Sequence, residues 1–297
     1  MKARRHLTTR SWSVRALAGG VLQGAIILAL CLSLAPLRAG ASEPRRIVSL
    51  NVCIDQILVD LVDKPRIAAV TFLATDPLTA VEPSRAAGLR TIRGSAEEVL
   101  ALDPDLVLAG RYTTPATVDL LRRLGRRVEI VPLPSTTAEV IEVVRTIARH
   151  VGAEARGEQL VAGLEQHVRK PARGDRPSAL IYQVNNFVSS PYDLANDVLA
   201  AAGLANAAGR LTSARSGQVT LEAILTAPPD LLVLAGSPST YRTAVADNLR
   251  HPAIARLLAD RPHATLSWPL LLCGTHHVGR AIEALAVARD RIGGERR

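Results

Sequence analysis

The sequence predicts an α/β protein made of two similar lobes, each with a mainly parallel sheet, joined by a helix. Three observations support this class. Strand-like runs of four to eight residues alternate with longer amphipathic stretches. A polar, basic segment with two prolines, "RKPARGDRPS", interrupts the alternation once. One stretch also occurs twice, as "EEVLALDPDLVLAG" and "EAILTAPPDLLVLAG". A chain of 297 residues is long enough for two domains that each bury a core.

The first 41 residues are typical of a secretory signal peptide. Basic residues precede an apolar run from Ala16 to Leu34, and small residues at Ala39 to Ala41 provide a cleavage site. The run is long enough to cross a bilayer, so an uncleaved anchor is the competing interpretation. A lipid anchor is disfavoured because Leu30, not a small residue, precedes Cys31. We therefore expect an exported protein.

The net charge of +9 overstates the basic character of the exported chain. Six of the 36 basic residues lie in the predicted signal, which has no acidic residue, so 30 remain against 27 acidic residues, a net charge of +3. The remaining arginines are scattered, with no aromatic residues interleaved. This pattern argues against a nucleic-acid partner.

The N-terminal α/β lobe is predicted over residues 42–152. Its strands are expected at 46–50, 66–73, 105–110 and 127–133, and its helices at 53–62, 96–102, 115–125 and 137–152. Strands that alternate with helices in this way form crossover units and a parallel sheet.

A connecting helix is predicted over residues 153–170, and the C-terminal α/β lobe over residues 171–297. In this second lobe the strands are expected at 179–184, 230–236 and 264–270, and the helices at 197–206, 221–227, 244–260 and 276–292.

The repeated stretch indicates that the two lobes share one plan. Glu97 and Glu222 are 125 residues apart, as are Pro104 and Pro229. A helix, a Pro-Asp turn and a buried strand form a common crossover device, because proline stops the helix and Asp suits the turn. The further helical pattern after each strand, and the Glu that opens the preceding helix in both halves, favour duplication.

Few aromatic side chains are available to build a binding site, and most are expected near strand ends. The exported chain has seven, namely Phe72, Tyr112, Tyr182, Phe187, Tyr192, Tyr241 and Trp268. Ligands bind at the carboxyl edge of open parallel sheets. Phe72 and Tyr182 could instead pack inward. Tyr112, Phe187, Tyr241 and Trp268 fall in loop-like segments and are expected to line a cleft. With the polar residues Arg111, Gln183, Asn185 and Asn186, they would suit a large, partly planar and partly polar ligand.

Sequence signatures of common enzymes are missing. No glycine-rich phosphate loop follows the first strand, and no "GxSxG" motif occurs. Cys53 at a helix start could act as a nucleophile with His276 or His277, but no local motif supports this. Consecutive residues on a helix point about 100° apart, so the two histidines are poorly placed to bind one metal. One of them, with Cys53 or Cys273, could ligate the iron of haem or another chelate; otherwise they are a helix-start residue and a packing residue.

Four segments carry a resemblance to a known family: "RIVSLNVCIDQILVDLV", "GSAEEVLALDPDLVLAG", "LRRLGRRVEIVP" and "VTLEAILTAPPDLLVLAG". In their order and spacing they resemble the periplasmic substrate-binding proteins of iron-siderophore and cobalamin ABC transporters, over residues 45–292. The resemblance implies the class III fold, in which two Rossmann-like lobes are joined by a long rigid helix and the ligand sits in the cleft between them.

The resemblance also implies function. The protein would be a periplasmic solute-binding component and not an enzyme, would have no cofactor, and would carry a ferric siderophore, a cobalamin-like corrinoid or haem as its ligand. Its partner would be an ABC importer permease dimer with its ATPase, to which the monomer docks through one surface glutamate on each lobe. Glu97 and Glu222 match those positions. Each could also simply complement a helix N-terminus. A haem or metal-ion binder is the near alternative, and an exported α/β enzyme the distant one.

The ligand-binding residues are predicted from strand ends and from this resemblance. They are Asn51, Cys53, Phe72, Arg111, Tyr112, Asn185, Phe187, Tyr241, Trp268, Cys273 and His276.

Two features of these positions leave the ligand open. The proline common after the first strand is replaced by "SLNVC", and only Trp268 corresponds to the tryptophans of cobalamin pockets.

Cys53 and Cys273 form a disulfide or remain two free thiols. We expect them either to approach each other across the cleft or to line the ligand site, and a Cα separation above about 7 Å would exclude a bond without backbone movement.

Overall fold

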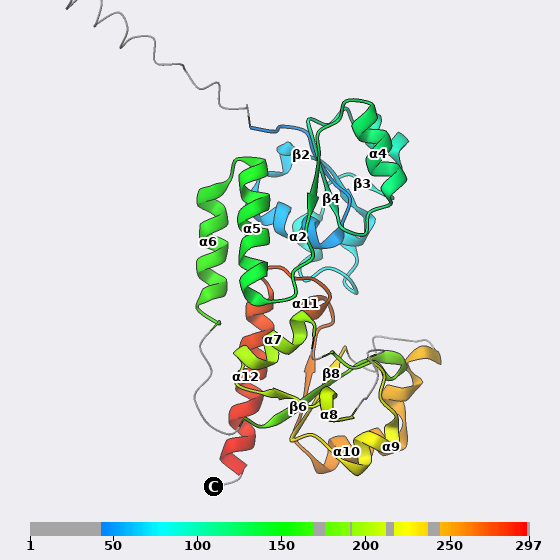
Figure 1. Ribbon diagram of the computed structural model, residues 1–297, viewed down its shortest axis with the longest axis vertical. Coiled ribbons are helices and arrows are strands. Elements are labelled where there is room, and N and C mark those ends of the chain that lie inside the picture. The colour runs from blue at the N-terminus through cyan, green and yellow to red at the C-terminus, as the bar shows by residue number, and fades with distance from the viewer. Residues whose placement is uncertain (1–42, 169–175, 191, 212–216, 237–243, 296–297) are drawn as a thin grey trace, which may run out of the picture. The chain divides into compact units, whose positions relative to one another are not determined.

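Two parallel sheets, each covered by helices on both faces, make up the described part of the chain (Figure 1). The computed structural model describes residues 43–168, 176–190, 192–211, 217–236 and 244–295. The predicted signal, Tyr241 and the last two residues of the predicted connecting helix lie outside these ranges. The fold class predicted from the sequence is confirmed.

The first sheet has the order β3-β2-β1-β4-β5, and all its strand pairs are parallel. Successive residues of a strand face opposite sides, so β1 and β4 supply two cores. Ile47 and Leu106 pack with α2 and α5, whereas Val48 and Val107 pack with α3 and α4. The strands are β1 (Ile47–Ser49), β2 (Ile67–Thr71), β3 (Thr91–Ile92), β4 (Leu106–Gly110) and β5 (Val128–Val131). The helices are α2 (Val52–Leu61), α3 (Ala96–Leu100), α4 (Pro115–Arg123) and α5 (Thr137–Val151), with short 3₁₀ turns η2 (Lys64–Arg66), η3 (Phe72–Thr75) and η4 (Pro83–Ala86).

The second sheet has the order β7-β6-β8-β9, also all parallel. It repeats the order β2-β1-β4-β5 of the first sheet, so the two halves share a topology as well as a sequence stretch. The strands are β6 (Ser178–Tyr182), β7 (Ala205–Asn206), β8 (Leu231–Ala235) and β9 (His263–Leu266). The helices are α7 (Leu194–Ala201), α8 (Ala208–Leu211), α9 (Leu221–Thr226), α10 (Pro252–Asp260), α11 (Pro269–Leu272) and α12 (Val278–Glu295), with 3₁₀ turns η5 (Val184–Asn186) and η6 (Ala244–Arg250).

The repeated stretch has the same hydrogen bonds in both halves. Ser95 caps α3 and Thr220 caps α9, and each side chain accepts a bond from the backbone N–H three residues later. The Asp of each Pro-Asp turn then holds the start of the neighbouring strand. Asp105 accepts from the backbone N–H of Arg46, and Asp230 accepts from that of Ser178. These conserved roles explain why both halves keep a hydroxyl residue, then Pro-Asp, at one spacing.

A helical hairpin follows the first sheet. α5 ends at Gly152, whose left-handed φ of 66° favours glycine, and α6 (Glu154–Glu165) then lies beside α5 (Figure 1). α6 occupies the range in which the connecting helix was predicted and also contacts α12. None of the helices in the described part of the chain combines the length and hydropathy of a membrane-spanning segment.

Several predicted element boundaries were wrong. The helix expected over 197–206 ends at Ala201, and its last two residues form β7. The strand expected over 264–270 ends at Leu266, since Pro269 starts α11. The helix expected over 244–260 is two elements separated by His251, and β3 was not predicted. The last helix begins at Val278, so His276 and His277 lie in the turn before it.

Candidate ligand-binding site

A hollow lies at the carboxyl edge of the first sheet, where ligands of parallel sheets bind. Its walls are formed where three strands end: by Asn51 beyond β1, by residues 110–112 at the end of β4, and by residues 131–134 at the end of β5. Helix side chains close its floor, and Gly274, from the second half of the chain, forms part of its wall. The full lining is Asn51, Cys53, Ile54, Ile57, Gly110, Arg111, Tyr112, Val131, Pro132, Leu133, Pro134, Val143 and Gly274.

Asn51 fixes the local backbone at this edge. It is the N-cap of α2, and its side-chain oxygen accepts bonds from the backbone N–H groups of Cys53 and Ile54 at 2.9 and 3.3 Å. Gly110 lies against it, and a Cβ there would stand 2.7 Å from the Asn51 amide nitrogen. A glycine at the end of β4 is therefore required for the two strand ends to approach.

The rim of the hollow exposes unusual amounts of apolar and aromatic surface. Tyr112 is 79% exposed and Leu133 is 49% exposed, and Arg111 beside them is also exposed. Exposed rings and aliphatic groups beside a cation suit a partner that is flat, partly apolar and partly anionic.

A disulfide joins the two halves of the chain at this hollow. Cys53, in the first turn of α2, is bonded to Cys273, directly after α11, with a Cα separation of 5.1 Å. Of the two arrangements expected from the sequence, the structure therefore shows the bonded one. Gly274 follows immediately, and a Cβ on it would collide with the ring of Pro134. The bond thus holds the second half of the chain against the wall of the hollow.

The carboxyl edge of the second sheet is built from asparagines. Asn185 and Asn186 both adopt left-handed φ values, 57° and 60°, just after β6. The Tyr182 hydroxyl donates to the Asn186 side-chain oxygen at 2.5 Å, and the Asn248 amide donates to the Gln183 carbonyl at 2.9 Å. Tyr182 is buried, so it packs inward, which is one of the two roles expected from the sequence. Burial raises the pKa of its hydroxyl. Phe187, 40% exposed, remains at this edge.

The structure brings together only some of the predicted ligand-binding residues. Asn51, Cys53, Arg111 and Tyr112 line the hollow, and Cys273 is bonded to it through Cys53. The other described residues do not line it. Asn185 and Phe187 lie at the edge of the second sheet. The Phe72 ring lies under the guanidinium of Arg93, with 5.3 Å between the ring centroid and Cζ. Trp268 packs against the second core, and His276 contacts Asp60.

Sequence reasoning missed the prolines and Gly274 of the lining. The segment "VPLP" follows β5, so the strand-end argument that selected Tyr112 applies equally to Pro132 and Pro134. Nothing in the sequence around Gly274 indicated that it lines the hollow. It reaches the hollow because the neighbouring Cys273 is bonded to Cys53.

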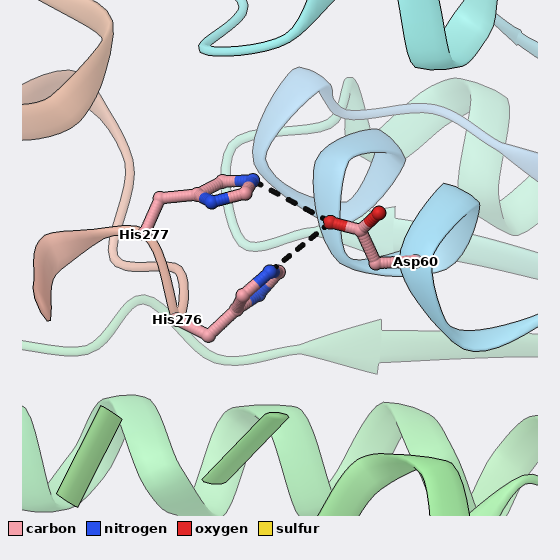
Figure 2. Close-up of side chains that lie close together, drawn as sticks. All are labelled: Asp60, His276 and His277. Atoms are coloured by element: carbon pink, nitrogen blue, oxygen red, sulfur yellow. Dashed lines mark hydrogen bonds and ion pairs between the residues drawn. The ribbon is translucent and has the colours of Figure 1, made fainter. Parts of the chain in front are cut away.

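A second cluster lies at the far end of α2, and Figure 2 shows its three side chains. The Nε2 atoms of His276 and His277 approach the same oxygen of Asp60, Oδ2, at 3.1 and 3.5 Å. The expectation that adjacent histidines diverge was wrong, because both lie in an irregular turn instead of a helix. Burial opposes ionisation of Asp60, but His276 and Arg85 outweigh it and lower its pKa. Burial lowers the pKa of His277 to about 4.

The two predicted docking glutamates occupy equivalent, exposed positions. Glu97 lies in the first turn of α3 and Glu222 in the first turn of α9. A hydrogen bond from its own backbone N–H, and then one from Ser95, lower the pKa of Glu97. Its neighbour Glu98 turns back to complete the capping box, so Glu97 is the carboxylate left facing solvent.

Comparison with known proteins agrees with the family predicted from the sequence. The family model described as "Periplasmic binding protein" matches residues 47–261. The cobalamin-binding protein of Halobacterium salinarum is 28% identical over 199 residues, which cover 65% of this chain and 54% of that protein. An uncharacterized ABC transporter substrate-binding lipoprotein of Bacillus subtilis, YvrC, is 26% identical over 204 residues, which cover 64% of this chain and 63% of it. The chain thus spans little more than half the length of the curated relatives it matches.

Solved structures of similar fold also exist. The apo form of the periplasmic heme-binding protein RhuT from Roseiflexus sp. RS-1 has a TM-score of 0.68 and 26% identity, and the match covers 84% of this chain and 98% of that one. The periplasmic vitamin B12 binding protein BtuF of Vibrio cholerae has a TM-score of 0.61 with the same coverage. At 16% identity, this second match shows the fold alone.

Proposed function

Because the chain belongs to the periplasmic binding protein family, we propose that it is the solute-binding component of an ABC importer, not an enzyme, and that its ligand enters the hollow described above. The observation that carries this proposal is the hollow's construction. Three consecutive strand ends of the first sheet form it, a disulfide-linked segment of the second half completes it, and its rim exposes an aromatic ring and a cation. Such a site suits capture of a preformed molecule.

The proposed ligand is a metal chelate, either an iron chelate or a cobalamin-like corrinoid. A macrocycle presents a flat apolar face and a polar rim, which match the Tyr112 ring, the prolines of residues 131–134 and the Arg111 guanidinium. The relatives named for cobalamin and heme agree with a ligand of this class.

Haem is the specific alternative, and Tyr112 is the observation that favours it. Its side chain is 79% exposed at the hollow, and a tyrosine phenolate can serve as an axial ligand to haem iron. Arg111 beside it could pair with a propionate. A corrinoid would use the same ring for stacking only.

Titration of the chain from residue 43 onward with cyanocobalamin, a ferric siderophore and haem tests both proposals by absorbance. We expect saturable 1:1 binding of one of the three. Arg111→Ala and Tyr112→Phe should weaken it, while Tyr192→Phe serves as the control because Tyr192 is equally exposed, at 81%, and lies outside the hollow. If the charge-transfer bands of bound haem disappear in Tyr112→Phe but persist in the other two variants, Tyr112 ligates the iron and the haem alternative is supported. Failure to bind any of the three would refute the proposed ligand class.

Docking to the importer is proposed through Glu97 and Glu222. They are exposed carboxylates at equivalent places on the two halves of the chain, and such charges set orientation and encounter rate more than affinity. The double variant Glu97→Lys with Glu222→Lys should reduce uptake in reconstituted vesicles and leave ligand affinity unchanged. Glu165→Lys, an exposed reversal at the end of α6, is the control. Normal uptake by the double variant would remove this role.

Export to the periplasm is proposed from residues 1–41. Signal cleavage after Ala41 would give a mature chain with two cysteines, Cys53 and Cys273, in an oxidising compartment. N-terminal sequencing of protein recovered from the native periplasm tests this. An intact N-terminus in the membrane fraction would favour the anchor.

A further inference from the structure

The cluster of Asp60, His276 and His277 is not part of the proposed ligand site. None of its members lines the hollow at the carboxyl edge of the first sheet. Residues 273–277, here called the strap, meet α2 first at Cys53 and again at Asp60, seven residues further along the helix. That separation is about two helical turns, or roughly 10 Å. The cluster therefore lies at the opposite end of α2 from the hollow.

The three ligand atoms already have distances that suit a metal. In a tetrahedral zinc site with bonds of about 2.0–2.1 Å, neighbouring ligand atoms lie about 3.3 Å apart. The Asp60 Oδ2 atom lies 3.1 Å from the His276 Nε2 atom and 3.5 Å from the His277 Nε2 atom. Ligand atoms of the three residues all lie within 4.8 Å of one another.

We propose that Asp60, His276 and His277 bind one resident Zn²⁺ ion that fixes the strap to the end of α2. Two imidazoles and one carboxylate are the ligands that zinc prefers, and Figure 2 shows both rings directed at the same carboxylate oxygen. Three protein ligands leave a fourth position for water.

The surroundings of the cluster favour a bound ion. The three side chains are only 9–11% exposed, so the site is shielded from solvent. Arg85 holds the other oxygen of Asp60, Oδ1, through an ion pair at 2.5 Å. This bond orients the carboxylate and leaves Oδ2 for the metal, as outer ligands do in metal sites.

The hollow beside the cluster provides the fourth position. It is lined by His277, Asp60, Gln56 and Asp55, among others. Two fully buried polar atoms of these residues, Asp55 Oδ1 and Gln56 Nε2, have no hydrogen-bond partner in the described part of the chain, and neither does His276 Nδ1. Buried polar atoms without partners mark places for ordered water. Water here could fill the fourth position and bond to these groups.

The charge around the site predicts moderate affinity. Arg85 already neutralises Asp60, so the cation gains less attraction than from an unpaired carboxylate. We therefore expect a dissociation constant on the order of micromolar. Because the donors are mainly nitrogen, Mg²⁺ and Ca²⁺, which prefer oxygen ligands, should not compete.

The experiment uses the chain from residue 43 onward without a histidine tag, freed of metal with a chelator and titrated with Zn²⁺ by calorimetry. One ion should bind per chain, with an excess of Mg²⁺ present throughout. His276→Gln and His277→Gln should each weaken binding at least tenfold. His263→Gln is the control, because His263 is exposed and distant from the cluster in sequence and contacts. No stoichiometric binding below about 100 μM Zn²⁺, or equal affinity in all variants, would overturn the proposal.

A second measurement does not depend on how the variants fold. Co²⁺ bound to the unmodified chain should give the intense visible bands of a four-coordinate nitrogen and oxygen site, and Zn²⁺ should displace it. Weak bands typical of six-coordinate aqueous Co²⁺ would refute the assignment. Neither assay contains the proposed chelate ligand or the importer. Failure to bind zinc would therefore not affect the proposed transport role, and failure to bind a chelate would not affect the proposed zinc site.

Discussion

Removal of the Cys53–Cys273 disulfide should greatly destabilise the protein. The bond closes a loop with a sequence separation of 220 residues. In the chain-entropy model, a cross-link over that length lowers the entropy of the unfolded chain enough to stabilise the native state by about 5 kcal/mol. Measured effects usually fall below this ceiling, so we expect the double variant Cys53→Ala with Cys273→Ala to lose about 2–5 kcal/mol in its free energy of unfolding.

Urea denaturation with and without a phosphine reductant measures this loss. The oxidised protein with both cysteines should lose the same free energy on reduction as the double variant loses by substitution. The double variant serves as the control, because its free energy of unfolding should be the same with and without the reductant. A difference below about 1 kcal/mol, or two free thiols titrated in the oxidised native protein, would refute the reasoning.

Three further predictions concern the stability of the fold at other positions. Burial raises the pKa of Asp55 to about 7, so the native state binds a proton that the unfolded chain releases near pH 4. The free energy of unfolding should therefore fall by up to about 4 kcal/mol as pH rises from 4 to above 7, and Asp55→Asn should abolish most of that dependence in urea titrations. Gly274→Ala should lower the thermal midpoint because its methyl group would meet Pro134, whereas Gly163→Ala, which meets nothing within 4 Å in a helix, should raise it. Ser95→Ala should cost about 1 kcal/mol of stability by removing the cap of α3, as measured by chemical denaturation.

The sequence predicted the parallel sheets well because their central strands are buried on both faces. Leu106 to Ala109 and Leu231 to Ala235 are almost fully buried, so their apolar runs stand out from the flanking helices. The two-residue edge strands β3 and β7 have no such pattern, and β7 was mistaken for the end of a helix. Short edge strands form through their neighbours more than through their own residues.

Only part of the lining of the hollow could be predicted from the sequence. The rule that ligands bind beyond strand ends selected Asn51, Arg111 and Tyr112, and the structure places all three around one hollow. The same rule selected Trp268, which does not line this hollow, because Pro269 starts a helix there and the ring packs against the second core. The paired directions of His276 and His277 depend on an irregular turn, which no helical periodicity can encode.

The strap gives the proposed ligand site and the proposed metal site one mechanical connection. Fixed to α2 at Cys53 by a covalent bond and at Asp60 by two imidazoles, the strap cannot translate along the helix. Two fixed points along one helix still allow rotation about the line that joins them. Since one fixed point borders the hollow, such a rotation would move Gly274 against Pro134, where there is no spare room. Ligand entry at this site should therefore depend on motion of the exposed rim residues Arg111 and Tyr112 more than on displacement of the strap.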